Sequence, residues 1–133
     1  MSADKAHILV VDDEPNVLVT YRLILQQQGY TVSAAISSDE ARNCLKQGDV
    51  DLLLCDLSLE KQQSGFDVIQ FGRSLDPTLQ AVLLTGYASV EANDRAEQEN
   101  IPVLFKPIDI QQLLQVIAEL LRKNNESRQA HGH

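Results

Sequence analysis

Two apolar runs in this sequence stop abruptly on carboxylates. Residues 8–11 are followed at once by Asp12 and Asp13, and residues 52–55 are followed by Asp56. Neighbouring carboxylates repel each other unless a proton or a cation relieves the repulsion. A divalent cation with oxygen ligands is the natural candidate, and Mg²⁺ suits a site that keeps water and binds a phosphate. The acidic residues therefore indicate a magnesium site that handles phosphate.

Two further apolar runs end on residues that suit the same chemistry. Residues 80–84 lead to Thr85, and residues 101–105 lead to Lys106. Phosphoryl transfer needs a carboxylate nucleophile, acids that hold a metal, and a hydroxyl and a cation for the transferred oxygens. A lysine supplies that cation as a compact point charge. Each residue alone would be ordinary, because strand ends often carry acidic caps and a single Thr or Lys is common on a surface. Their joint occurrence favours a phosphoryl site.

The pattern of apolar residues indicates that these runs are strands separated by helices. The runs do not alternate with polar residues, so each strand should be covered on both faces, as in a parallel sheet. A proline at the first helical turn, helical spacing of apolar residues and glycines at helix ends mark the intervening helices. The expected strands are residues 7–11, 30–35, 51–55, 80–84 and 101–105, and the expected helices are residues 15–28, 37–48, 65–75, 88–99 and 110–122.

Five strands that alternate with five helices predict a three-layer α/β fold, with a parallel sheet between two layers of helices. The expected strand order is 2-1-3-4-5. In this order the first and third strands are neighbours, which brings Asp12, Asp13 and Asp56 together at the carboxyl edge of the sheet. The fourth and fifth strands bring Thr85 and Lys106 to the same edge.

The composition limits the class of protein. The 133 residues suffice for one domain, which we place at residues 1–123, and the polar residues 124–133 are expected to form a disordered tail. A net charge of -8 argues against binding to nucleic acid. The sequence contains neither a membrane-spanning run nor a signal-peptide pattern, so we expect a cytoplasmic protein that does not contact a membrane. Cys44 and Cys55 lack metal-ligand spacing and are expected to be free, buried thiols.

Four short motifs, taken together in this order and spacing, resemble the receiver domains of bacterial two-component response regulators. The resemblance covers about residues 7 to 122, and the motifs are Val10-Val11-Asp12-Asp13-Glu14, Leu54-Cys55-Asp56, Leu84-Thr85-Gly86 and Phe105-Lys106-Pro107. It implies the flavodoxin-like (βα)5 fold. It also implies a phosphorylatable signalling domain rather than an enzyme, with a histidine kinase or a histidine phosphotransfer protein as its partner.

The resemblance implies a role for each residue at this edge of the sheet. Asp56 would accept the phosphoryl group, and Thr85 and Lys106 would bind its oxygens. The Lys106-Pro107 peptide bond would be cis, an isomer that only a bond before proline adopts at low cost. The implied ligands of Mg²⁺ are Asp13, Asp56 and the backbone carbonyl of Ser58, with Asp12 acting through water.

The sequence departs from the family pattern in three places. The loop after Asp56 is one residue longer than usual and carries Glu60 where a proline is common. Val103 stands where the family usually has a Tyr or Phe whose side chain reports phosphorylation. Tyr87 occupies a variable position, two residues after Thr85, that influences dephosphorylation in the family.

These departures bear on how a signal would leave the site. In the family it passes to a downstream protein through the face formed by the fourth helix, the fifth strand and the fifth helix, where the aromatic side chain turns inward. Valine has one stiff torsion and too little reach for such a movement. We hypothesise that Tyr87 moves with Thr85 and takes over part of this role, and the alternative is that Tyr87 is an ordinary exposed loop residue. Phe105 is expected to be a core residue. A homodimer is left open.

We interpret the chain as a stand-alone receiver because it ends soon after the fifth expected helix, although a domain cut from a longer regulator would have the same sequence. One alternative is a phosphatase of the haloacid dehalogenase type, which also uses a strand-end Asp, Mg²⁺ and Lys. That class needs an acid two residues after its nucleophile, whereas Asp12 and Asp13 are adjacent, and 133 residues leave little room for a cap domain. A second alternative is a receiver that takes no phosphate and acts only as a docking module.

Overall fold

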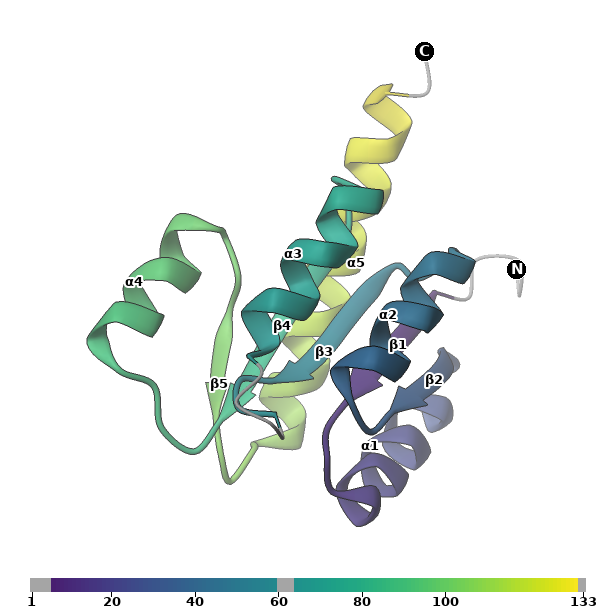
Figure 1. The fold of residues 1–133 in the computed structure, drawn as a ribbon. Helices are drawn as coiled ribbons and strands as arrows, with labels where there is room; N and C mark the ends of the chain where they lie inside the picture. The colour runs from purple at the N-terminus through teal and green to yellow at the C-terminus, as the bar shows by residue number, and fades with distance from the viewer. Residues whose placement is uncertain (1–5, 60–63, 132–133) are drawn as a thin grey trace.

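Five strands form one parallel sheet that carries helices on both faces (Figure 1). The computed structural model describes residues 6–59 and 64–131. The strand order is β2-β1-β3-β4-β5, which confirms the prediction of a flavodoxin-like architecture. The strands are β1 (His7–Val11), β2 (Thr31–Ala35), β3 (Leu52–Asp56), β4 (Gln80–Thr85) and β5 (Val103–Phe105). The helices are α1 (Pro15–Gln27), α2 (Ser38–Gln47), α3 (Gly65–Leu75), α4 (Val90–Gln98) and α5 (Ile110–His131).

Each face of the sheet builds its own core, because consecutive strand residues point to opposite faces. On one face Leu53 and Cys55 of β3 pack with Leu83 of β4 in a cluster that includes residues of α2 and α3. On the other face Leu52 and Leu54 of β3 join a cluster with residues of α1 and α5. All five side chains are fully buried. This covering of both faces explains why the strand runs are continuously apolar.

The close approach of α3 to β3 depends on Gly65, the first residue of α3. A Cβ atom at this position would lie 2.6 Å from the backbone oxygen of Asp56, a distance that only glycine avoids. Gly65 donates its N–H to the carbonyl of Leu57 at 2.8 Å. The side chain of Ser64 caps the helix by accepting the N–H of Phe66 at 3.1 Å. The end of β3 is therefore held directly against the start of α3.

The structure differs from the expected disordered tail, because α5 continues to His131. The sequence contains no proline or glycine between Pro107 and Gly132, so nothing in it breaks the helix. Asn124, the first residue of the expected tail, is buried and donates its side-chain amide to the carbonyl of Asp51 at 3.3 Å. A polar composition after Lys123 thus accompanies a continued helix instead of its end.

The edge strand β5 differs from the prediction in two ways. It begins at Val103 rather than Ile101, and the residue before it, Pro102, has no N–H with which to extend the ladder. The expectation that Phe105 is a core residue is wrong, since the residue is 52% exposed. Phe105 is the last residue of a strand at the edge of the sheet, so no further strand packs beside it.

Two simpler expectations can be compared directly with the structure. Both cysteines are free thiols, as predicted, and Cys55 is buried as expected, whereas Cys44 is only partly buried. Among residues 6–59 and 64–131, no helix is both long and apolar enough to cross a membrane.

Candidate functional site

The carboxylates of Asp12, Asp13 and Asp56 gather at the carboxyl ends of β1 and β3, which are neighbours in the sheet. Each offers one oxygen atom, and these three atoms all lie within 4.8 Å of one another. The register pairs Val11 with Cys55, so the residues that follow them meet at the same edge. Asp12 and Asp56 are buried, and Asp13 is partly exposed. The structure thus places the three acids together, as the strand order predicted.

The carboxylate of Asp12 is only partly compensated. Its Oδ1 accepts the backbone N–H of Glu14 at 2.9 Å, but its buried Oδ2 has no hydrogen-bond partner. The ammonium of Lys106 lies 3.7 Å from that oxygen. Burial raises the pKa of Asp12, and the charge of Asp56 adds to the increase. The N–H of Glu14 and the charge of Lys106 act in the opposite direction without cancelling it. A cation at this carboxylate would therefore be favourable.

Lys106, the residue after β5, brings a positive charge to the same edge. Its ammonium donates a hydrogen bond to Oδ2 of Asp56 at 3.0 Å. Burial acts to lower the pKa of Lys106, but the hydrogen bond and charge of Asp56, together with the charge of Asp12, raise it on balance. The backbone N–H of Lys106 donates to the carbonyl of Thr85 at 2.8 Å, and the Lys106-Pro107 bond is cis, as predicted. The side chain is therefore held as a cation beside the carboxylates.

The hydroxyl of Thr85 is buried and faces its own loop. It donates a hydrogen bond to the carbonyl of Tyr87 at 2.6 Å and accepts one from the N–H of the same residue at 3.1 Å. Tyr87 itself is 77% exposed. Thr85 thus lies at the predicted edge, and it contacts Tyr87 through the backbone and not through the ring.

The set of donor atoms fits a hard divalent cation. It consists of carboxylate oxygens, and Oδ2 of Asp12 is buried without a hydrogen-bond partner. Oδ1 of Asp56 accepts the N–H of Ser58 at 3.1 Å, which holds the backbone of Ser58 at this edge. Within the described part of the chain, neither a histidine nor a cysteine belongs to the cluster. These ligands suit magnesium better than zinc.

Other residues of interest stand outside the cluster. Val103 is partly buried and packs against the core cluster that contains α2 and α3. Glu60 lies outside the described residues. Tyr21 is a buried residue of α1, and it lies within electrostatic reach of the site. Burial raises its pKa, and the charges of Lys106 and Asp12 act on it in opposite directions. Helical spacing alone could not distinguish Tyr21 from an ordinary core residue.

The strand order and the polar side chains at the carboxyl edge of the sheet indicate the class of protein. Comparison with known proteins identifies the family. The chain matches the response regulator receiver domain over residues 8–118, and it belongs to this family. It is 31% identical over 125 residues to the transcriptional regulatory protein GlrR of Escherichia coli. The aligned region covers 93% of this chain and 28% of GlrR. It is also 31% identical over 132 residues to the response regulator protein PilR of Pseudomonas aeruginosa. That match covers 98% of this chain and 29% of PilR. The chain thus spans less than a third of either relative.

Solved structures show the same fold. The response regulator receiver domain protein (CheY-like) from Methanospirillum hungatei is 26% identical with a TM-score of 0.87, covering 93% of this chain and 99% of that one. A response regulator receiver domain protein from Clostridium thermocellum is 27% identical with a TM-score of 0.83. The match covers 90% of this chain and 97% of that one. The chain is therefore a receiver domain, a signalling domain of two-component response regulators, and the phosphatase alternative is not favoured.

Proposed function

We propose that this chain is the phosphoacceptor receiver of a two-component system or phosphorelay, with Asp56 as the phosphorylated residue. The observation that carries the proposal is the group of three carboxylates within 4.8 Å of one another, with the ammonium of Lys106 3.0 Å from Asp56. A buried Asp12 oxygen without a hydrogen-bond partner lowers stability, so a purely structural role does not explain this arrangement. A site that binds a cation and a phosphoryl group does explain it.

In the proposed reaction an oxygen of the Asp56 carboxylate attacks the phosphorus of a phosphohistidine. The new P–O bond forms as the P–N bond breaks, and the histidine nitrogen leaves with the electron pair of that bond. Lys106 holds the carboxylate beforehand and binds the phosphoryl oxygens afterwards. The hydroxyl of Thr85 exchanges its bond to the carbonyl of Tyr87 for a bond to a phosphoryl oxygen.

The residues that would hold Mg²⁺ are Asp12, Asp13, Asp56 and the backbone carbonyl of Ser58. Bound there, the ion would offset the negative charge of the carboxylates and of the incoming phosphoryl group. Two properties of Asp12 support this assignment, namely its unpartnered Oδ2 and its raised pKa. A cation relieves both, because it interacts with the ionised carboxylate.

The phosphoryl donor in this proposal is a histidine kinase or a histidine phosphotransfer protein, and the phosphorylated state acts on a downstream protein partner in the cytoplasm. We place the output surface on the face formed by α4, β5 and α5. The exposed side chains of Tyr87, Val90 and Phe105, which lie in or next to α4 and β5, support that placement. A net charge of -8 supports a role without direct contact to nucleic acid or an anionic membrane.

Intact mass after incubation with acetyl phosphate and Mg²⁺ tests the proposal. We expect a gain of one phosphoryl group in the wild type and none in Asp56→Asn, which keeps the size of the side chain but removes the nucleophile. Chelation of the metal should prevent the gain. A wild type that gains no mass, or an Asn variant that gains as much, would refute Asp56 as the phosphoacceptor and favour the docking-only alternative.

The same samples separate a receiver from an enzyme. A receiver transfers the phosphoryl group to its own Asp56 and hydrolyses it slowly, so it does not turn over an external phosphomonoester. We expect no phosphate release from a small phosphomonoester beyond the rate in buffer. Sustained release that depends on Mg²⁺ would support the phosphatase alternative.

A further inference from the structure

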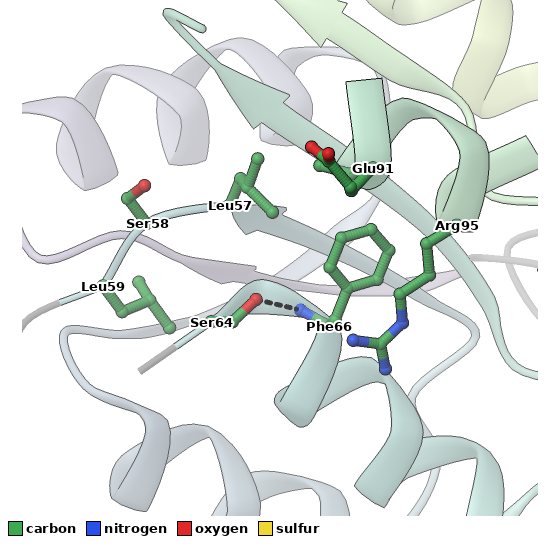
Figure 2. Close-up of a pocket in the computed structure, with 8 residues that line it drawn as sticks. Leu57, Ser58, Leu59, Ser64, Phe66, Glu91 and Arg95 are labelled. Atoms are coloured by element: carbon green, nitrogen blue, oxygen red, sulfur yellow. Dashed lines mark hydrogen bonds between the residues drawn. The ribbon is translucent and has the colours of Figure 1, made fainter. Parts of the chain in front are cut away.

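Helix α4 is attached to the rest of the fold by few buried groups. Ala96 is its one buried residue, and Val90 at its start is 72% exposed. A pocket of about 480 Å³ lies between α4 and the residues that follow β3. Leu57, Ser58 and Phe66 line one side of it, and α4 lines the other (Figure 2). The helix therefore has room to move relative to the segment that begins immediately after Asp56.

Arg95 links α4 to α3 at the wall of this pocket. The central carbon of its guanidinium lies 4.3 Å from the centroid of the Phe66 ring, and Figure 2 shows the two groups facing each other. The ring face attracts such a cation. The Nε of Arg95 also donates to the carboxylate of Glu99 at 2.7 Å, which favours one side-chain conformation. Arg95 thus connects α4 to the ring of Phe66 at the start of α3.

Phe66 is in turn connected to Asp56 through consecutive contacts. Oδ1 of Asp56 accepts the N–H of Ser58 at 3.1 Å. Ser58 pairs with Ser64 in an antiparallel β-bridge. The hydroxyl oxygen of Ser64 accepts the N–H of Phe66 at 3.1 Å, as the dashed line in Figure 2 marks. These contacts form a continuous path from Asp56 to the first turn of α3, where the Phe66 ring is attached.

We propose that Arg95 is a positioning residue that couples the charge state of Asp56 to the position of α4, and that it acts through Phe66. The inference rests on the proposed phosphorylation of Asp56. Phosphorylation converts the carboxylate into an acyl phosphate, so the oxygens available to the N–H of Ser58 change in position and charge. The bridge between Ser58 and Ser64 passes the movement to Phe66.

This route does not require an aromatic side chain at residue 103. Val103 packs against the core and lacks the reach to alternate between two positions. The contact between Phe66 and Arg95 is already formed before phosphorylation, whereas Phe105 is exposed. The pocket supplies the space into which the ring and the guanidinium can shift. The movement of α4 then alters the surface that a partner contacts.

Three single variants and one double variant of the full chain test the coupling. Phe66→Leu removes the ring but keeps an apolar side chain, and Arg95→Met removes the charge but keeps an unbranched chain. The double variant combines these two changes. Glu99→Gln is the matched control, because it removes the ion pair with Arg95 and leaves the ring in place. The measurement is hydrogen exchange of the amides in residues 90–98, with and without acetyl phosphate and Mg²⁺, and intact mass is read from the same samples.

We expect phosphorylation of the wild type to change the exchange rate of α4 by about fivefold, the lower end of coupling between two sites. Phe66→Leu and Arg95→Met should take up the phosphoryl group like the wild type, but their phosphorylation-dependent change should fall to about twofold or less. The double variant should lose no more than either single variant, because the two residues act through each other. Glu99→Gln should keep the wild-type change.

Phosphorylated Phe66→Leu and Arg95→Met variants whose α4 responds like the wild type would overturn the coupling and leave the proposed function intact. An equal loss of response in Glu99→Gln would also overturn it, because the ion pair and not the stacked ring would then position the helix. The absence of a mass gain in the wild type would instead overturn the proposed function, and the coupling with it.

Discussion

The ammonium group of Lys106 lies 3.0 Å from Oδ2 of Asp56, although the two residues are 50 positions apart in the sequence. The same ammonium lies 3.7 Å from Oδ2 of Asp12, so one cation serves two buried carboxylates. The contact joins the last strand of the sheet to its central strand across β4. Lys106 therefore offsets part of the negative charge that Asp12 and Asp56 bring to this edge of the sheet.

Replacing Lys106 with methionine should weaken both properties. The ion pair is partly exposed, so in metal-free protein at neutral pH we expect a loss of about 1–2 kcal/mol in the free energy of unfolding, less than for a fully buried pair. Phosphorylation by acetyl phosphate should slow by about 100-fold, the usual effect of removing one charge-stabilising donor. Urea unfolding and timed intact mass measure the two effects. Lys123→Met, at an exposed position of α5, is the control, and equal behaviour of the two variants would contradict the assignment.

Asp12 should destabilise the metal-free protein when it is ionised. Burial raises its pKa in the folded state, so the folded protein keeps this proton to a higher pH than the unfolded chain does. The stabilisation from protonated Asp12 is complete below the pKa that the group has in the unfolded chain. It is lost as the pH rises through the higher pKa that the group has in the folded protein. With a chelator present, Asp12→Asn should be more stable than the wild type at pH 7 by about 1 kcal/mol. The difference should vanish near about pH 4, the unfolded pKa of aspartate.

Urea unfolding of both proteins at the two pH values checks this prediction. The asparagine keeps an oxygen that can accept the N–H of Glu14, so the turn after β1 is preserved. A less stable Asn variant at neutral pH would show that the ionised carboxylate of Asp12 is well compensated without metal.

Mg²⁺ should raise the melting temperature, because it relieves repulsion among Asp12, Asp13 and Asp56 only in the folded state that gathers them. At a Mg²⁺ concentration of about 100 times Kd the stabilisation should be about 2.7 kcal/mol. Asp13→Ala should respond much less, whereas Asp94→Ala, at an exposed position of α4, should respond like the wild type. Thermal unfolding across a Mg²⁺ titration measures these responses. An Asp13→Ala variant with the wild-type response would exclude Asp13 as a ligand.

The sequence was sufficient to predict which residues meet at the site. Continuous apolar runs identify buried strands, and short right-handed connections limit the sheet to a few strand orders, among which 2-1-3-4-5 was expected. Because Asp12, Asp56, Thr85 and Lys106 each stand at a strand end, the order alone brings them to one edge. Their placement depends on the path of the backbone, and the positions of the apolar runs predict that path well.

Side-chain contacts between distant elements could not be predicted in this way. The stack of Arg95 on Phe66 joins two helices, and neither residue belongs to a periodic pattern that reveals the other. The hydroxyl of Thr85 has several acceptors within reach of its strand end, and only the structure shows that it donates to the carbonyl of Tyr87. Polar composition after Lys123 likewise did not reveal that α5 continues. These features depend on local packing, for which the hydrophobic pattern carries no signal.

The ring of Tyr87 offers a separate prediction about the lifetime of the acyl phosphate. Tyr87 is 77% exposed, so Tyr87→Ala should change the free energy of unfolding by less than about 0.5 kcal/mol. The substitution also leaves intact both hydrogen bonds to Thr85, because these involve only the backbone of Tyr87. Any effect on the phosphorylated state can therefore be assigned to the ring.

In the proposed phosphorylated state the hydroxyl of Thr85 would turn to a phosphoryl oxygen, so its 2.6 Å bond to the carbonyl of Tyr87 would be lost and the loop would move. We expect the ring then to shield the acyl phosphate from water, so that Tyr87→Ala shortens the phosphate lifetime by about two- to fivefold, the effect of losing one modest contact. Phosphorylation-induced amide shifts in residues 88–105 should also differ from those of the wild type. Tyr87→Phe keeps the ring and should behave like the wild type. In a Thr85→Val background, which lacks the hydroxyl that moves the loop, Tyr87→Ala should have no further effect. An unchanged lifetime together with an unchanged shift pattern in Tyr87→Ala would show that the ring plays neither part.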